Sequence, residues 1–338
     1  MPAQGRKLDL ETSTAPAPVT RRKINLETSA TLALIIFLLF VFFSVATHGV
    51  FFTVENLANL LRQTSINGVI ALGMLVVIIT AGIDLSVGAV AGFSGIFVAT
   101  LIQAHQVHPL LAWALAIAAG GCLGAGMGLL IASLRLPAFL ITLGGMFLAR
   151  GGGFWINTDS VGISHPFYDR MSRLELDLGP RFHLPATALI FLVVAAAAFV
   201  LAHHTRFGRT LLAVGGNEQS ALLMGLPVRL AKVAVYTLNG MCAAAAGVVA
   251  TLYTGSGNPS MGVGMELDAI AIAVIGGAVL TGGRGNLFGT VVGVLIFGTI
   301  QSALLFDGRL SPSWTRIVVG ALLLGFILLQ RLLVRRAA

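Results

Sequence analysis

The sequence contains little charge. Only 10% of its 338 residues are charged, and 57% are hydrophobic, whereas about a quarter of the residues in an ordinary soluble domain are charged. This composition excludes a water-soluble globular protein. A membrane-spanning helix needs about 20 predominantly apolar residues, so about ten such helices and their connections occupy the chain and leave no separate soluble catalytic domain.

Catalytic and metal-binding motifs are also absent. The sequence has no G-x4-G-K-[ST] loop to hold the phosphates of a nucleoside triphosphate, and no G-x-S-x-G or H-E-x-x-H. Cys122 and Cys242 lie in apolar runs, where thiols behave as small hydrophobic groups. His203 and His204 are adjacent rather than helically spaced. We therefore predict that this chain is not an enzyme and carries no metal site and no cofactor.

Basic residues outnumber acidic ones, with 21 Lys and Arg against 13 Asp and Glu. They are diluted among apolar runs and form no basic stripe, so they do not predict a nucleic-acid partner. In membrane proteins, Lys and Arg are concentrated in cytoplasmic loops. An even number of spans with both termini in the cytoplasm places most of these cations inside and leaves a minority, Arg62 and Arg150 among them, outside.

The apolar runs predict an all-α integral membrane protein, a polytopic helix bundle with about ten spans. Residues 1–28 are polar and predict a disordered cytoplasmic tail, with a signal peptide cleaved near Ala46 as the alternative. Residues 29–332 form one transmembrane domain, and 333–338 form a cytoplasmic tail. The eighth span is short and interrupted by glycine, which suggests a broken helix. The predicted spans are 30–47, 65–81, 87–104, 110–133, 137–156, 184–202, 232–253, 268–282, 286–305 and 314–331.

One sequence pattern is repeated in two parts of the chain. The pattern T-x-G-x5-G-x-V-x-G occurs at residues 80–92 and again at 281–293. Both copies lie at a junction between spans on the same side, as a parallel repeat in a duplicated transporter would. Because the chain has 41 glycines, chance explains the repeated pattern as well as gene duplication does.

Glycines also recur at every fourth position in two places, so each set lines one helix face. Small residues let helix backbones approach closely in lipid, where dispersion contacts replace the hydrophobic drive. We therefore expect tight packing of these helices within the bundle. The glycines are Gly120, Gly124, Gly128, Gly285, Gly289 and Gly293.

Asp84 lies between Gly82 and Gly88, at the junction of two apolar runs. A carboxylate is costly in hydrocarbon, so Asp84 must lie in a loop, a broken helix or a polar cavity. It either caps the next helix, with Ser86 or the first amides as its partner, or belongs to a transport pathway or gate.

The connection 203–231 carries the signals of a short helix of about two turns, from Glu218 to Met224. Asn217 is a good N-cap, and Gly225 followed by Pro227 ends the helix. So short a helix is marginal alone in water. It therefore docks against either the membrane face of its own protein or a separate partner. The segment comprises Asn217, Glu218, Gln219, Ser220, Leu222, Leu223, Met224 and Gly225.

The largest predicted outer loop, residues 157–183, mixes acidic residues, histidines and the aromatic residues Phe167 and Tyr168. It is either a docking surface for an external partner or a solvated loop.

Several motifs point to one family. They are ITAGIDLSVGA at 79–89, TRFG and AVGGN within 205–217, and ELDAI and VIGG within 266–277. From about Ile66 to Arg331 the chain resembles the permease subunits of bacterial ABC sugar importers of the ribose, xylose and galactofuranose group. Shorter motifs are most similar to the second permease of the galactofuranose importers, at 136–139, 165–169, 223–225 and 306–308.

The resemblance implies an inner-membrane subunit that pairs with an identical or different permease and receives sugar from a periplasmic binding protein. A cytoplasmic ATPase, which binds the ATP and magnesium, would drive it through the coupling helix 217–225, flanked by Arg206 and Arg209. Membrane lipid is the remaining partner. Polar residues within or beside the spans would then contact the sugar or, instead, bond a neighbouring helix. These candidates are Asp84, Ser86, Asn67, Ser94, Thr142, Asn239 and Gln301.

An ion-coupled secondary sugar transporter is the alternative. Such proteins normally show carboxylates inside the membrane or discontinuous ion sites. Here Asp84 and Asp268 are the acids at span edges, and both lie near predicted helix ends.

Overall fold

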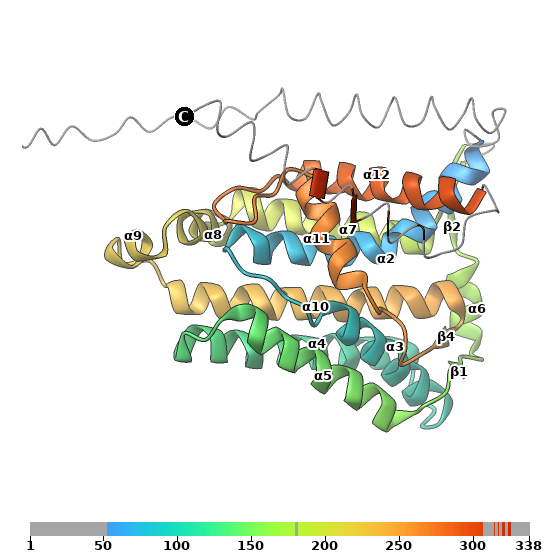
Figure 1. The fold of residues 1–338 in the computed structure, drawn as a ribbon. Coiled ribbons are helices and arrows are strands. Elements are labelled where there is room, and N and C mark those ends of the chain that lie inside the picture. Colours follow the sequence, from blue (N-terminus) through green and yellow to red (C-terminus); the bar gives the residue numbers. More distant parts are fainter. Residues whose placement is uncertain are drawn as a thin grey trace, which may run out of the picture.

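Figure 1 shows the computed structural model, which describes residues 53–179 and 182–306 together with positions 314, 317, 320, 321, 324 and 325. The tails predicted at 1–28 and 333–338, the span 30–47 and most of the span 314–331 lie outside these residues. The described part consists of helices and two very short two-stranded sheets. The all-α fold class is therefore confirmed.

Five described helices are long and apolar enough to cross a membrane. They match five of the predicted spans, although α2 begins eleven residues before the predicted start at 65. Two further apolar helices, α3 (Val87–Gln103) and α12 (Leu287–Phe306), match two more. The chain is thus a polytopic helical membrane protein. The five long helices are α2 (Val54–Ile79), α4 (Pro109–Leu134), α5 (Ala138–Ile156), α7 (Ala186–His204) and α10 (Val228–Thr254).

The eighth predicted span, 268–282, is shorter in the structure. α11 (Met265–Ile275) has 11 residues, about 16 Å of helix, or roughly half of a hydrocarbon core of about 30 Å. Gly277, Gly282 and Gly283 follow with positive φ angles of 91°, 85° and 73°. Because these conformations end a helix, α11 is a half-length helix followed by a turn.

The connections gather at two ends of the bundle, which we call the α9 end and the α6 end (Figure 1). The α9 end carries α8 (Arg206–Gly216) and α9 (Glu218–Leu223). The α6 end carries α6 (Pro166–Ser172) and both sheets. In these sheets, β1 (Val161–Gly162) pairs antiparallel with β4 (Ser256–Gly257), and β2 (Glu175–Gly179) pairs antiparallel with β3 (Phe182–Pro185).

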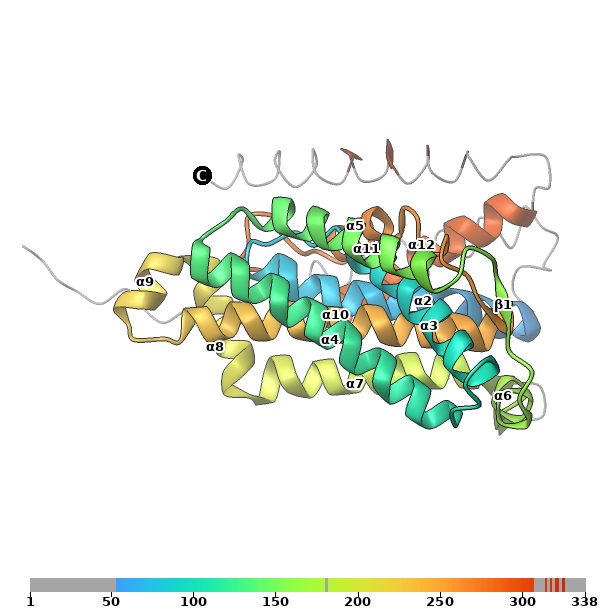
Figure 2. The ribbon, with the colours of Figure 1, turned by 90° about the horizontal axis from the view of Figure 1, so that it is seen from below.

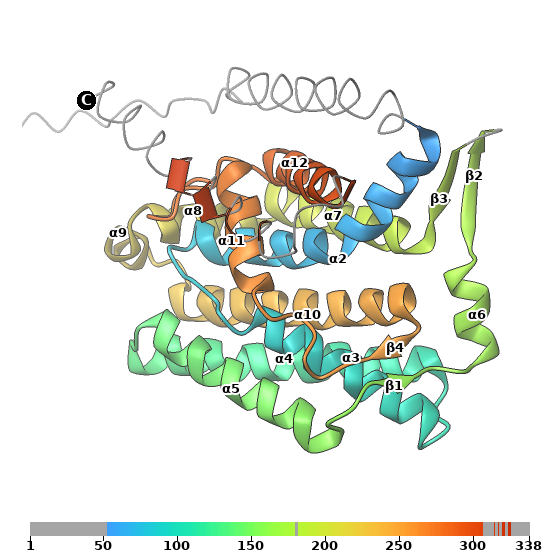
Figure 3. The same ribbon diagram turned by 45° about the vertical axis from the view of Figure 1, so that its right-hand side comes forward.

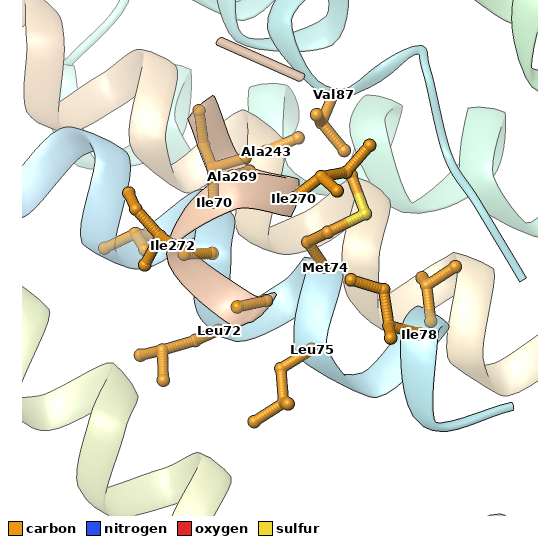
Figure 4. Close-up of a cluster of buried hydrophobic side chains, with 14 of the residues drawn as sticks. Ile70, Leu72, Met74, Leu75, Ile78, Val87, Ala243, Ala269, Ile270 and Ile272 are labelled. Carbon is orange, nitrogen blue, oxygen red and sulfur yellow. The ribbon is translucent and has the colours of Figure 1, made fainter. Parts of the chain in front are cut away.

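α10 is the central helix. It packs against α4, α2 and α3, and Figure 3 shows it between a layer holding α3, α4 and α5 and a layer holding α2, α7 and α12. α3 and α11 both begin in the interior and leave toward opposite layers, α3 against α10 and α5, and α11 against α2 and α12. Apolar side chains from α2, α3, α10 and α11 meet there in one buried cluster (Figure 4).

Figure 2 shows α4 crossing α10, and the glycines of α4 lie where the two helices contact each other. A Cβ atom at Gly120 would lie 2.5 Å from the carbonyl oxygen of Gly240, and one at Gly128 would lie 2.9 Å from Cα of Val233. A Cβ at Gly124 would collide with the carbonyl oxygen of Tyr236. The two backbones therefore touch along α4, as small residues at a membrane helix contact allow.

The second glycine set packs α12 onto α11. A Cβ at Gly293 would lie 2.5 Å from the carbonyl oxygen of Ile272, and one at Gly289 would collide with that of Gly276. Gly285 does not share this helix face, because it lies in the turn before α12 begins. A Cβ there would meet the Ile79 side chain at 2.6 Å.

The two copies of the repeated pattern meet at their first residues, at the α9 end. Ala81 and Gly282, which occupy the same place in the pattern, both have positive φ angles, 59° and 85°. A Cβ at Gly282 would lie 2.8 Å from that of Ala81, and the Gly283 amide donates a hydrogen bond to the Ile79 carbonyl at 2.9 Å. The α2–α3 and α11–α12 connections thus form one packed unit.

Replacing Gly124 with alanine should destabilise the protein by roughly 1–3 kcal/mol, because the added methyl group overpacks the contact with α10. The measurement is the thermal unfolding midpoint of the purified protein in detergent. Gly126→Ala is the matched control, since a Cβ at Gly126 meets nothing within 4 Å and alanine favours the helix. Equal midpoints for the two variants would contradict the packing described here.

Candidate functional site

The short helix expected in the connection 203–231 is present as α9. Asn217 caps it, because its Oδ1 accepts a hydrogen bond from the Ser220 amide at 2.8 Å. The helix ends at Leu223, one residue earlier than predicted, and Gly225 follows with a φ of 74°. These are the N-cap and the glycine terminus that the sequence signals.

α9 is fastened to the first turns of α10. The Lys232 ammonium on α10 forms an ion pair with the Glu218 carboxylate at 2.7 Å. Ala221 is fully buried, and its carbonyl accepts a hydrogen bond from the Leu226 amide at 3.0 Å. The base of α9 is therefore packed against its own protein.

The tip of α9, in contrast, faces outward. Leu222, Leu223 and Met224 are 51%, 89% and 67% exposed, and Arg206 and Arg209 on the neighbouring helix α8 are exposed as well. A contiguous exposed apolar group with a polar rim is typical of a protein interaction site. The geometry thus gives α9 a docked base and a free apolar tip.

A buried polar cluster lies where α3 begins. Oδ1 of Asp84 accepts hydrogen bonds from the amide and the hydroxyl of Ser86, at 2.8 and 2.6 Å, and Oδ2 accepts one from the Asn239 side chain of α10 at 2.8 Å. All three residues are buried. These bonds link the α2–α3 connection to the centre of α10, so in this conformation the cluster joins helices and does not reach the surface.

Thr142 of α5 joins the same connection. Its hydroxyl accepts a hydrogen bond from the Leu85 amide at 3.2 Å and donates to the Ala138 carbonyl at 3.0 Å. The other polar candidates lie on separate helices, Asn67 on α2, Ser94 on α3 and Gln301 on α12. Oδ1 of Asn67 and Oγ of Ser94 are buried and have no hydrogen-bond partner within the described chain.

Arg150 is a site that the sequence analysis missed. Although the charge pattern assigned it to the outside, its guanidinium turns toward the backbone ahead of α11 and donates hydrogen bonds to the carbonyls of Pro259 and Met261, at 2.7 and 2.5 Å. It also packs beside Gly92 of α3 and lies in the field of Glu266 on α11. Its position inside an apolar run was the available signal, because ionisable residues in membrane helices usually have a specific partner.

The region 157–183, predicted as an outer loop, contains α6 and strands of both sheets. Trp113 of α4 stacks edge-on against Phe167 and donates a hydrogen bond to the Tyr168 hydroxyl at 2.7 Å, and that hydroxyl pairs with Thr251 of α10 at 3.1 Å. Both aromatic residues therefore pack onto the bundle. Arg62 of α2 ties β2 to the bundle through an ion pair with Glu175 at 2.7 Å.

The β2–β3 hairpin carries one titratable pair, His183 and Asp177, 2.5 Å apart. The hydrogen bond to Asp177 raises the pKa of the exposed His183. A raised histidine pKa means that the pair is fully formed below about pH 6.5 and is lost as the pH rises through the folded-state pKa.

Among the described residues, no three His, Cys, Asp or Glu side chains gather as metal ligands. His203 and His204 lie in the last turn of α7, and Phe199 stacks on His203.

These features define an integral membrane protein of the multispan helical class, with a short helix projecting from one end. Within that class the chain belongs to the family described as "Branched-chain amino acid transport system / permease component", whose model matches residues 56–327. It is a transport permease.

Individual relatives agree with this family. The chain is 46% identical over 281 residues to the inner membrane ABC transporter permease protein YjfF of Escherichia coli K12, covering 83% of this chain and 85% of the relative. It is 39% identical to the ribose import permease protein RbsC of the same strain, covering 75% and 79%. It is 35% identical to the fructose import permease protein FruG of Bifidobacterium longum, covering 93% and 94%. No solved structure matches the chain significantly.

Replacing Arg150 with methionine should lower the stability of the folded protein by roughly 1.5–3 kcal/mol, because two backbone carbonyls ahead of α11 lose a charged donor. The thermal unfolding midpoint in detergent measures the loss. Arg150→Lys keeps the charge and can serve only part of the two-carbonyl contact, so its midpoint should fall between those of the methionine variant and the unmodified protein. Three identical midpoints would refute the role of Arg150.

Proposed function

We propose that the chain is the membrane permease subunit of an ABC importer that moves a monosaccharide across the bacterial inner membrane. Its relatives support this assignment, because they include ribose and fructose import permeases and a permease of a xylose transport system. The exposed apolar tip of α9 is the observation that carries the mechanism, since the chain has no P-loop of its own and needs a surface on which an ATPase can act.

In this mechanism ATP and magnesium bind to a separate cytoplasmic ATPase, and α9 is the coupling helix. Leu222, Leu223 and Met224 enter the ATPase surface, with Arg206 and Arg209 beside them. The base of α9 is attached to α10 by the Glu218–Lys232 ion pair. A displacement of the tip of α9 therefore also moves α10, which contacts α2, α3 and α4. A shift of that kind is the type of rigid-body motion that alternating access requires.

The remaining partners follow from the same class. A second permease, identical to this chain or different from it, completes the pathway, and a periplasmic binding protein delivers the sugar at the α6 end. Both termini then lie in the cytoplasm, on the side of α9. In the conformation described above, the Asp84 cluster holds the α2–α3 connection against α10. If these hydrogen bonds break during transport, the cluster lines or gates the pathway.

Replacing Leu222 and Leu223 together with aspartate should leave the protein folded in the membrane but weaken its association with the ATPase. Fully burying a leucine side chain contributes roughly 1.5–3 kcal/mol, so the Kd should rise at least about tenfold. The measurement is co-purification with the ATPase and the sugar-stimulated ATPase rate.

The matched control is Leu174→Asp with Leu176→Asp, since these leucines are each 49% exposed near the α6 end. Unchanged ATPase association in the Leu222 and Leu223 variant, or an equal loss in the control, would contradict coupling through α9.

For the sugar itself we propose a member of the ribose, xylose and galactofuranose group, with galactofuranose first, because the motifs at 136–139, 165–169, 223–225 and 306–308 resemble that importer. In proteoliposomes holding the complete importer, unlabelled sugars of this group should compete with labelled galactofuranose, and leucine should not. Competition by leucine would refute the sugar assignment. Uptake driven by an ion gradient without the ATPase would instead favour a secondary transporter.

A further inference from the structure

A groove at the α9 end lies between the end of α4 and the helix α9. Its volume is about 630 Å³, within the roughly 300–1,000 Å³ typical of small-ligand sites. The end of α4 forms one wall, and α9 with the first turns of α10 forms the other. The charged residues of its lining are Arg135, Glu218, Arg229 and Lys232.

The groove holds three cations against one carboxylate. Glu218 is paired with Lys232. Arg229 donates from one Nη atom to the Ser133 hydroxyl at 2.8 Å, which leaves most of its five donors for another acceptor. No ion pair engages Arg135 within the described chain. The excess of unneutralised N–H donors predicts an anionic ligand.

Arg135 has an unusual backbone conformation. It follows α4 with a φ of 52°, a left-handed conformation that costs a non-glycine residue roughly 1–2 kcal/mol. A glycine would adopt this left-handed conformation without strain. Compared with glycine, arginine at this position contributes a positive charge. That charge sits at the negative end of the α4 dipole and points the cation into the lining of the groove.

The groove also lies at the depth of lipid headgroups. α4 and α10 are both long enough to span the membrane, and the groove is formed where α4 ends and α10 begins. Three leucines adjacent in the sequence to lining residues, Leu130, Leu134 and Leu230, are 44%, 61% and 70% exposed. A free anion would use only the cations, whereas a phospholipid would use both the cations and these exposed leucines.

We propose that this groove binds the headgroup phosphate of an anionic phospholipid of the phosphatidylglycerol type. The phosphate lies among Arg135, Arg229 and Lys232, and the acyl chains lie along the exposed leucines of α4 and α10. Basic pockets between transmembrane helices bind anionic headgroups in this way. Because the phosphate and the Glu218 carboxylate share Lys232, the bound lipid also contacts the ion pair that attaches α9 to α10.

The test is the number of phosphatidylglycerol molecules retained by the full-length chain, counted by native mass spectrometry after extraction from bilayers of phosphatidylglycerol and phosphatidylcholine. The unmodified protein should retain phosphatidylglycerol selectively. Arg135→Gln with Arg229→Gln should reduce that retention roughly tenfold or more, because two cations are lost. Arg170→Gln with Arg173→Gln, which removes two exposed cations at the α6 end, is the matched control and should retain the lipid. A single Arg135→Gln variant serves if the double variant does not fold.

Three results would overturn the proposal. Equal retention by the groove and control variants would place the lipid elsewhere. Displacement of the lipid by millimolar inorganic phosphate alone would make the groove a site for a free anion. Unchanged lipid retention in the groove variant, combined with weaker ATPase association in bilayers of phosphatidylcholine only, would make the groove a protein contact. Lipid retention is measured without the ATPase, so failure here is distinct from failure of the coupling mechanism.

Discussion

The close contact of backbones along α10 is the constraint on which the bundle depends. Lipid tails are as apolar as leucine side chains, so burying hydrophobic surface gives little drive for helices to associate inside a membrane. Atomic contact must supply the attraction instead, and each atom pair gains only about 0.1–0.2 kcal/mol. Gly120 and Gly124 of α4 meet Gly240 and Tyr236 of α10, which brings whole stretches of backbone into contact. α2 and α3 then pack on the helix that this contact positions.

Polar groups add specificity to this packing. Asp84 fixes the α2–α3 connection to α10 through Asn239, and Arg150 fixes the connection ahead of α11 to α5. Asp84 lies in the non-helical connection itself, and Arg150 reaches from α5 to the carbonyls of the turn ahead of α11. Non-helical backbone at membrane depth is tolerated only where protein or a polar cavity satisfies it. These two side chains therefore satisfy backbone groups at the breaks between helices.

Much of this architecture could be predicted from the sequence, because apolar runs and glycine spacing are local patterns. The caps of α9 were equally local, since Asn217 and Gly225 act on their own helix ends. The glycines of the eighth span predicted a broken helix, but the end of α11 at Ile275 was not predicted, because hydropathy carries no information on the positive φ of Gly277. The role of Arg150 was missed because its partners, Pro259 and Met261, are more than a hundred residues away in the sequence. Single-sequence patterns cannot reveal such a pairing.

The Lys232–Glu218 ion pair between α10 and α9 responds to solution conditions. The Lys232 and Glu218 side chains are 20% and 48% exposed, so dissolved ions reach their pair. The Debye length falls from about 10 Å at 0.1 M salt to about 3 Å at 1 M, whereas the uncharged Asn217 cap and the buried Ala221 contact do not depend on charge. Ionic strength therefore acts on the attachment of α9 and leaves its helical shape intact. The stiffness of the link between α9 and the bundle is thus set partly by the salt around it.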